Sequence, residues 1–159
     1  MTECPVKNPQ SRPQMDLPTA RAFLLYRHAY PNWYATELRP WEQFIAAPTW
    51  RVAKALLKVD ADSVVSIVER IVAEVPGSRE RSAWLCLGKV RQYRGNHQGA
   101  IEAFAYLAER DRCFKALYNV GVCHAALGEY DRARQAFLQV LELRSGDALA
   151  TEALGRLPS

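Results

Sequence analysis

The chain has 159 residues, 49% of them hydrophobic and 24% charged, and its formal net charge is +4. This composition is typical of one folded soluble domain and excludes a disordered or fibrous chain, while so small a charge does not by itself predict nucleic-acid binding. The sequence has no run of about 18 apolar residues and no apolar N-terminal core, so neither a transmembrane helix nor a signal peptide is expected. We therefore expect a cytoplasmic protein.

Residues 1–15 contain three prolines among polar side chains, which predicts an extended or disordered arm. Residues 16–47 are expected to form an N-terminal helical extension rich in aromatic side chains, with helices over about 16–30 and 40–46. Three tryptophans between residues 33 and 50 are interpreted as a cap over the open end of a helical stack. A peptide-binding aromatic surface is the alternative for these side chains. The extension is also a candidate surface for forming a homodimer.

Residues 48–77 are interpreted as a degenerate copy of the unit that follows them. An amphipathic helix over about 49–58 precedes a second helix that is capped by Asp60 or Asp62. The tryptophan that opens this copy precedes the tryptophan of the next unit by 84 − 50 = 34 residues, which is close to the spacing of the later units.

Residues 78–111 and 112–145 repeat one pattern at a fixed offset, for example 121 − 88 = 33. Each copy is predicted to form two antiparallel helices. One glycine marks the point where the helices approach, a second glycine ends the first helix, and an alanine and a phenylalanine share a face of the second helix. A C-terminal capping helix is expected over 147–157. Four matched pairs indicate the duplication: Gly88 and Gly121, Gly95 and Gly128, Ala100 and Ala133, and Phe104 and Phe137.

This pattern resembles the tetratricopeptide repeat, which reads W-x2-L-G-x2-Y, then A-x3-F, then P. The resemblance implies an all-α fold, a short right-handed α-solenoid of antiparallel helix pairs, here preceded by the helical extension. It also implies a scaffold that binds other proteins. Arg91 and His124 stand where the family usually has Tyr, and Arg112 and Ser145 stand where it often has Pro.

No pattern typical of a catalytic, cofactor or metal site is present in the sequence. Cys86, Cys113 and Cys123 lack the spacing of a zinc site and are expected to be reduced, buried thiols. None of the three histidines has a partner at the spacing that metal ligands on a helix require. We therefore predict no metal, no cofactor and no enzymatic activity.

In the family that the sequence resembles, the first helix of each pair lines a concave groove, which implies a peptide-binding site. One subset of the family holds acidic chaperone tails with a clamp of Lys, Asn and Arg, and only Asn119 matches that set, so the clamp is not expected. Packing between repeats is the alternative role for Leu85, Cys86 and Val122. The repeat alignment predicts a groove lined by Leu85, Cys86, Lys89, Gln92 and Tyr93 from one unit and by Lys115, Tyr118, Asn119, Val122 and Ala126 from the next.

Two further functions stay open beside a general scaffold for another protein. Residues 87–92 and 121–131 are similar to the class II chaperones of bacterial type III secretion, which would imply hydrophobic translocator clients in the groove. Nucleic-acid binding is less favoured, because acidic residues are interspersed with the basic ones. It would use Arg51, Lys54, Lys58, Lys89, Arg91 and Arg94, together with Trp50 and Tyr93.

Overall fold

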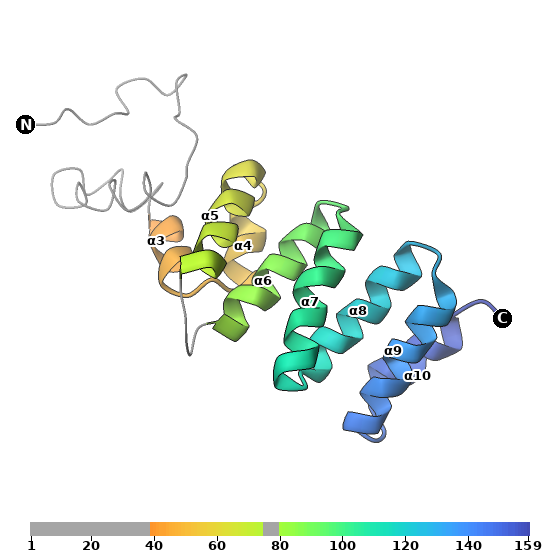
Figure 1. Cartoon of the computed structure of the whole chain (residues 1–159). Helices are drawn as coiled ribbons and strands as arrows, with labels where there is room; N and C mark the ends of the chain where they lie inside the picture. The colour runs from red at the N-terminus through yellow and green to blue at the C-terminus, as the bar shows by residue number, and fades with distance from the viewer. Residues whose placement is uncertain (1–38, 75–79) are drawn as a thin grey trace, which may run out of the picture. The chain divides into compact units, whose positions relative to one another are not determined.

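A computed structural model of the chain describes residues 39–74 and 80–159 (Figure 1). The expected arm and the expected helix over 16–30 lie outside these residues. Every regular element in the described ranges is a helix, which confirms the all-α prediction. The helices are α3 (Arg39–Ala46), α4 (Trp50–Leu56), α5 (Ala61–Glu74), α6 (Glu80–Tyr93), α7 (His97–Asp111), α8 (Phe114–Ala126), α9 (Tyr130–Leu143) and α10 (Ala148–Arg156).

The chain divides into two compact units, Met1–Ala83 and Trp84–Ser159, and the division falls inside α6. In the first unit α3, α4 and α5 pack against one another and bury Phe44 and Ile67 completely. The backbone N–H of Ser63 donates to Asp60 Oδ1 at 3.1 Å, so Asp60 rather than Asp62 caps α5. Whether α4 and α5 are a degenerate repeat stays a prediction.

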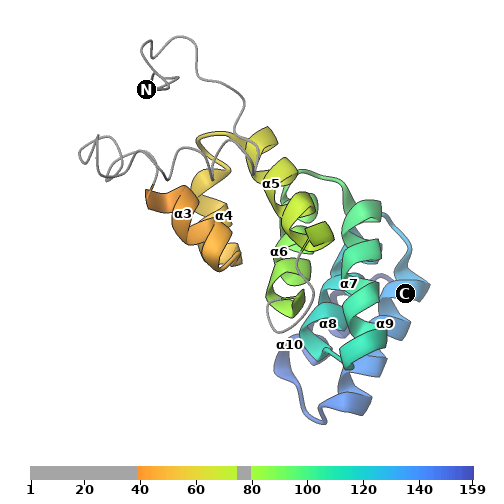
Figure 2. The same ribbon diagram turned by 60° about the vertical axis from the view of Figure 1, so that its left-hand side comes forward.

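The second unit is a row of helices in which each helix packs against the next one along the chain (Figures 1 and 2). α6 and α7 form one pair, α8 and α9 form the next, and α10 follows. Gly95 and Gly128 have φ values of 80° and 77°, in the left-handed region that favours glycine, directly after the first helix of each pair. This confirms that a glycine ends that helix in both copies.

Within each pair the two helices approach closely at a glycine. A Cβ atom on Gly88 would overlap the ring of Phe104, and a Cβ atom on Gly121 would lie 2.6 Å from Cε1 of Phe137. Both phenylalanines are buried, and the alanine one turn before each of them is buried too. The sequence expectation of a small residue opposite a large one is therefore confirmed, because any side chain at either glycine would displace the ring.

Arg91 and His124 occupy equivalent positions, 124 − 91 = 33, where the resembled family has Tyr. Both side chains reach across the turn that joins the two helices of their pair. Arg91 contacts α7, and His124 contacts the residue that precedes α9. Arg91 Nη1 donates to the carbonyl oxygen of Gly99 at 3.0 Å, and His124 Nδ1 lies 2.5 Å from Oε2 of Glu129. Both departures from the family pattern thus connect the end of one helix with the start of the next.

Replacing Gly121 by alanine tests the close approach. We expect Gly121→Ala to lower the free energy of unfolding by about 1–3 kcal/mol, because the new methyl group overpacks against Phe137. Gly155→Ala is the matched control, since Gly155 on α10 meets no neighbouring side chain within 4 Å among the described residues. Urea unfolding followed by circular dichroism measures both variants. Equal stability of Gly121→Ala and the unmodified protein would contradict the packing described here.

Candidate functional site

A pocket of about 640 Å³ lies along α8 and α10, and we call it the α8–α10 pocket. α6 and α9 add parts of its wall, and the turn before α10 closes one side. Four predicted groove residues, from α6 and α8, meet in this one pocket. The lining residues are Lys89, Phe114, Lys115, Tyr118, Asn119, Val140, Arg144, Gly146, Asp147, Ala148 and Leu149.

The floor of the α8–α10 pocket contains a chain of hydrogen bonds centred on Asn119. Lys89 Nζ donates to Asn119 Oδ1 at 2.7 Å, and Asn119 Nδ2 donates to the carbonyl oxygen of Lys115 at 2.7 Å. Asn119 is only 7% exposed, so this amide connects α6 with α8 as well as lining the pocket. Lys89 is half-buried, and burial lowers its pKa. Its partner is a neutral amide, so the ammonium charge is not neutralised by that bond.

The wall formed by α10 and the turn before it combines charge with apolar surface. The guanidinium of Arg144 lies 4.8 Å from the ring centroid of Phe114, and Arg144 Nε is 3.7 Å from Asp147 Oδ2. Asp147 also accepts a hydrogen bond from the backbone N–H of Ala150 at 3.0 Å, which caps α10. Leu149 is 59% exposed and offers apolar contact area on the same wall.

The remaining predicted groove residues do not line this pocket. Leu85 packs against the buried core of the second unit, and Cys86 is fully buried, so Cys86 was wrongly placed in the groove. Gln92 and Val122 are half-buried, and Tyr93 is 53% exposed near the end of α6. Ala126 is exposed at the end of α8. For Leu85 and Cys86 the packing alternative is therefore the better description.

Sequence reasoning missed the contribution of α10 and of the residues beside it. It treated α10 as a polar cap, whereas Ala148 and Leu149 line the α8–α10 pocket and Leu149 is largely exposed. A signal was available, because Leu149 stands 149 − 115 = 34 residues after Lys115, close to one repeat length from a predicted groove residue.

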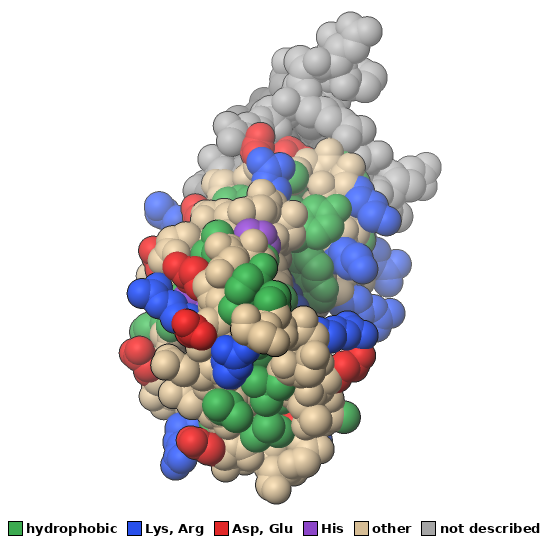
Figure 3. All heavy atoms as spheres, turned by 90° about the vertical axis from the view of Figure 1, so that its right-hand side faces the viewer, with side chains coloured by type: hydrophobic (Ala, Val, Ile, Leu, Met, Phe, Trp, Pro, Cys, Tyr) green, Lys and Arg blue, Asp and Glu red, His purple; other side chains and the backbone are tan. Residues whose placement is uncertain are grey.

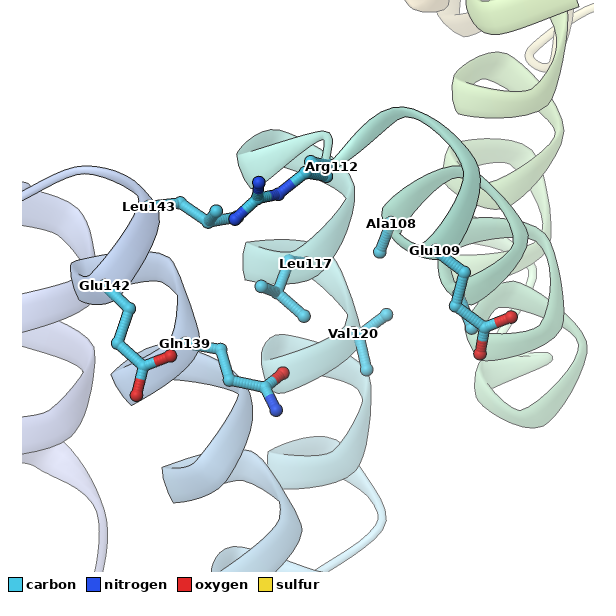
Figure 4. A pocket seen from close by; sticks show the side chains of 9 residues that line it. Ala108, Glu109, Arg112, Leu117, Val120, Gln139, Glu142 and Leu143 are labelled. Atoms are coloured by element: carbon cyan, nitrogen blue, oxygen red, sulfur yellow. The ribbon is translucent and has the colours of Figure 1, made fainter.

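A second, smaller pocket of about 330 Å³ lies between α7, α8 and α9 (Figure 4). Its surface includes Leu117, Val120 and Leu143, and the carboxylates of Glu109 and Glu142 stand at its sides. These two glutamates are one repeat apart, 142 − 109 = 33. The sequence analysis did not identify this pocket, which is lined mainly by the second helices of the two pairs.

The basic residues considered for nucleic-acid binding do not come together in one described unit. Arg51, Lys54 and Lys58 belong to the first unit, while Lys89, Arg91 and Arg94 belong to the second. Lys89 and Arg91 are engaged in the internal hydrogen bonds described above. No observation in the described residues therefore favours this function.

Cys86, Cys113 and Cys123 form no disulfide in the described part of the chain and are buried, as expected. Burial raises the pKa of Cys86 to about 12 and that of Cys123 to about 11, which keeps both thiols protonated near neutral pH. Among the described residues, no three His, Cys, Asp or Glu side chains are grouped as metal ligands would be. No helix in the same ranges is long and apolar enough to cross a membrane.

Comparison with known proteins supports the repeat assignment. The family model for the tetratricopeptide repeat matches residues 86–148. Among solved structures, the chain is similar to the crystal structure of MamA, with a TM-score of 0.59 and 19% sequence identity, over 86% of this chain and 73% of that one. At this identity the likeness concerns the fold alone. No curated protein matches the chain.

Replacing Asn119 tests whether its amide holds α6 and α8 together. We expect Asn119→Ala to lower the free energy of unfolding by about 1–3 kcal/mol, because Lys89 loses its acceptor in a half-buried position. Lys115→Ala is the control, since its exposed side chain is expected to change stability by less than about 0.5 kcal/mol. Denaturant unfolding measures both, and an unchanged midpoint for Asn119→Ala would mean that the amide has no structural role.

The buried thiols give a second prediction. Treating the folded protein with iodoacetamide at pH 8 should leave Cys86, Cys113 and Cys123 unmodified, because all three side chains are buried and burial also raises the pKa of Cys86 and Cys123. The unfolded protein should react at all three positions. Intact-mass and peptide mass spectrometry distinguish the two cases, and rapid modification of Cys86 in the folded protein would contradict the burial.

Proposed function

This protein carries tetratricopeptide repeats over residues 86–148, and from that premise we propose that it holds a segment of a partner protein in the α8–α10 pocket. Repeats of this kind are generally non-enzymatic scaffolds for protein–protein interaction, and stacked helix pairs present concave binding surfaces. The observation that carries the proposal is the convergence of four predicted groove residues with α10 in one pocket.

The chemistry of the α8–α10 pocket favours a segment with an acidic residue next to an apolar one. Lys89, Lys115 and Arg144 supply three positive charges, whereas Asp147 is the one carboxylate among the lining residues. Phe114 and Leu149 offer apolar surface beside those cations. A carboxylate of the partner would pair with the cations, and a neighbouring apolar side chain would cover Leu149.

A secretion-chaperone role belongs to the same class of function and differs in having one hydrophobic client. It stays a prediction, since the pocket lining combines charged side chains with apolar surface and so does not distinguish the two roles.

Peptide selection tests the proposal without any assumption about which partner binds. Random peptides displayed on phage and selected on the unmodified protein should be enriched in acidic residues adjacent to apolar ones. Fluorescence anisotropy then gives the affinity of a selected peptide for each variant. Lys115→Glu and Leu149→Ala should each weaken binding about tenfold, since each removes a contact worth about 1.4 kcal/mol.

The variants are chosen to separate binding from folding. Tyr118 and Asn119 are unsuitable, because the ring of Tyr118 packs 5.5 Å from that of Phe137 and Asn119 joins two helices. Lys54→Glu and Leu138→Ala are matched controls on exposed residues outside the pocket. Equal affinity of the pocket variants and the controls would refute the proposed site, as would selected peptides without acidic residues.

A further inference from the structure

The repeat register continues into α10, which carries the features of the first helix of a pair. Leu87-Gly88 and Val120-Gly121 are followed by Leu154-Gly155, with 121 − 88 = 33 and 155 − 121 = 34. In both complete pairs the second helix places a phenylalanine against this glycine. α10 is therefore the first half of a third pair.

The position that corresponds to Gly88 and Gly121 is uncovered on α10. Among the described residues no neighbouring side chain lies within 4 Å of a Cβ atom built on Gly155, whereas the same atom on Gly88 or Gly121 would overlap a phenylalanine ring. Gly155 and Thr151 are exposed, and Leu154 is half-buried. Figure 3 views the end of the chain that carries α9 and α10, and exposed hydrophobic side chains are visible there. α10 thus offers a seat for an aromatic ring that no described residue fills.

The two helices that cover such glycines share a sequence pattern. In each helix an alanine is followed, after two intervening residues, by the dipeptide Ala-Phe. After two further residues comes an aliphatic residue. All eight side chains are buried: Ala100, Ala103, Phe104 and Leu107 in α7, and Ala133, Ala136, Phe137 and Val140 in α9. An occupant of the open seat should carry the same pattern.

A related pattern occurs within the expected helix over 16–30, with the same Ala-Phe pair but with the aromatic Tyr26 where the covering helices have an aliphatic residue. Thr19, Ala22, Phe23 and Tyr26 have the spacing of the covering helices, with a small residue first and a large one last. The dipeptide Ala-Phe occurs only three times in the sequence, at 22–23, 103–104 and 136–137. The segment lies outside the described residues and joins them at Arg39, so its sequence alone carries the match.

We propose that residues 16–30 of a second copy of this chain cover α10, with Phe23 seated against Gly155. The segment continues into the first unit, which leads into α6, whereas α10 follows α9 at the opposite end of the row of helices in the second unit. A second copy therefore supplies the covering helix without the chain having to return along its own repeats. The contact joins two different surfaces, so copies associate head to tail. The proposal is independent of the α8–α10 pocket and its peptide.

Sedimentation velocity over a range of protein concentrations tests the association of the full chain. The unmodified protein should gain mass with concentration, and Phe23→Ala should weaken this association about tenfold or more, since buried aromatic anchors dominate interfaces. Gly155→Ala should weaken it as well while leaving the thermal midpoint equal or higher, because the methyl group meets open space within one copy. Leu24→Ala and Leu138→Ala are controls.

A cross-link identifies the contact itself. In a background with Cys4→Ser, a Phe23→Cys variant is mixed with a Gly155→Cys variant under mild oxidation. A disulfide between the two variants supports the proposal, and it should not form when Glu102→Cys on α7 replaces Gly155→Cys. A protein that stays monomeric at every concentration overturns the proposal. So does association that Gly155→Ala leaves unchanged, or a disulfide between positions 23 and 155 that forms only within single molecules of a doubly substituted variant.

Discussion

The second unit depends on the contact of a phenylalanine ring with a helix backbone at a glycine. Gly88 with Phe104 and Gly121 with Phe137 bring two helices so close that no other residue fits at the glycine. This contact determines the distance between the two helices of a pair and the position along their axes at which they cross. The next pair then packs on the surface that the previous pair presents, so a local steric constraint is propagated along the row of helices.

The same spacing determines which side chains are available for binding. Asn119 lies two residues before Gly121, on α8, and the close packing of α8 and α9 fixes its backbone. Its amide can then join Lys89 and the carbonyl oxygen of Lys115 without further adjustment. Lys115 and Leu149 remain on the open side, where they cost little stability and are free to meet a partner. In the proposed site, structural and recognition roles would thus be divided between neighbouring residues of the α8–α10 pocket.

Much of the fold could be predicted because its determinants are local in sequence. The glycines at 95 and 128, the alanine–phenylalanine faces and the cap of α5 each follow from a residue type at a fixed spacing. The lining of the α8–α10 pocket was predicted only in part. Cys86 and Leu85 share the helix of Lys89, and repeat alignment alone does not say which of them faces the core. The role of α10 was missed because its polar residues, Thr151, Glu152 and Arg156, are typical of a solvent-facing cap.

The hydrogen bond between Lys89 and Asn119 connects ligand binding in the α8–α10 pocket with the stability of the protein. A carboxylate partner would have cancelled the ammonium charge, whereas the amide leaves a net cation in a half-buried position of the free protein. Because this ammonium group has lost part of its hydration, its burial lowers the free energy of unfolding of the protein without ligand. An anion that arrives beside it removes part of this penalty, so the filled protein should resist heat better than the free one by more than its contact area alone suggests. The α8–α10 pocket thus contains a positive charge that the protein itself does not neutralise through this hydrogen bond.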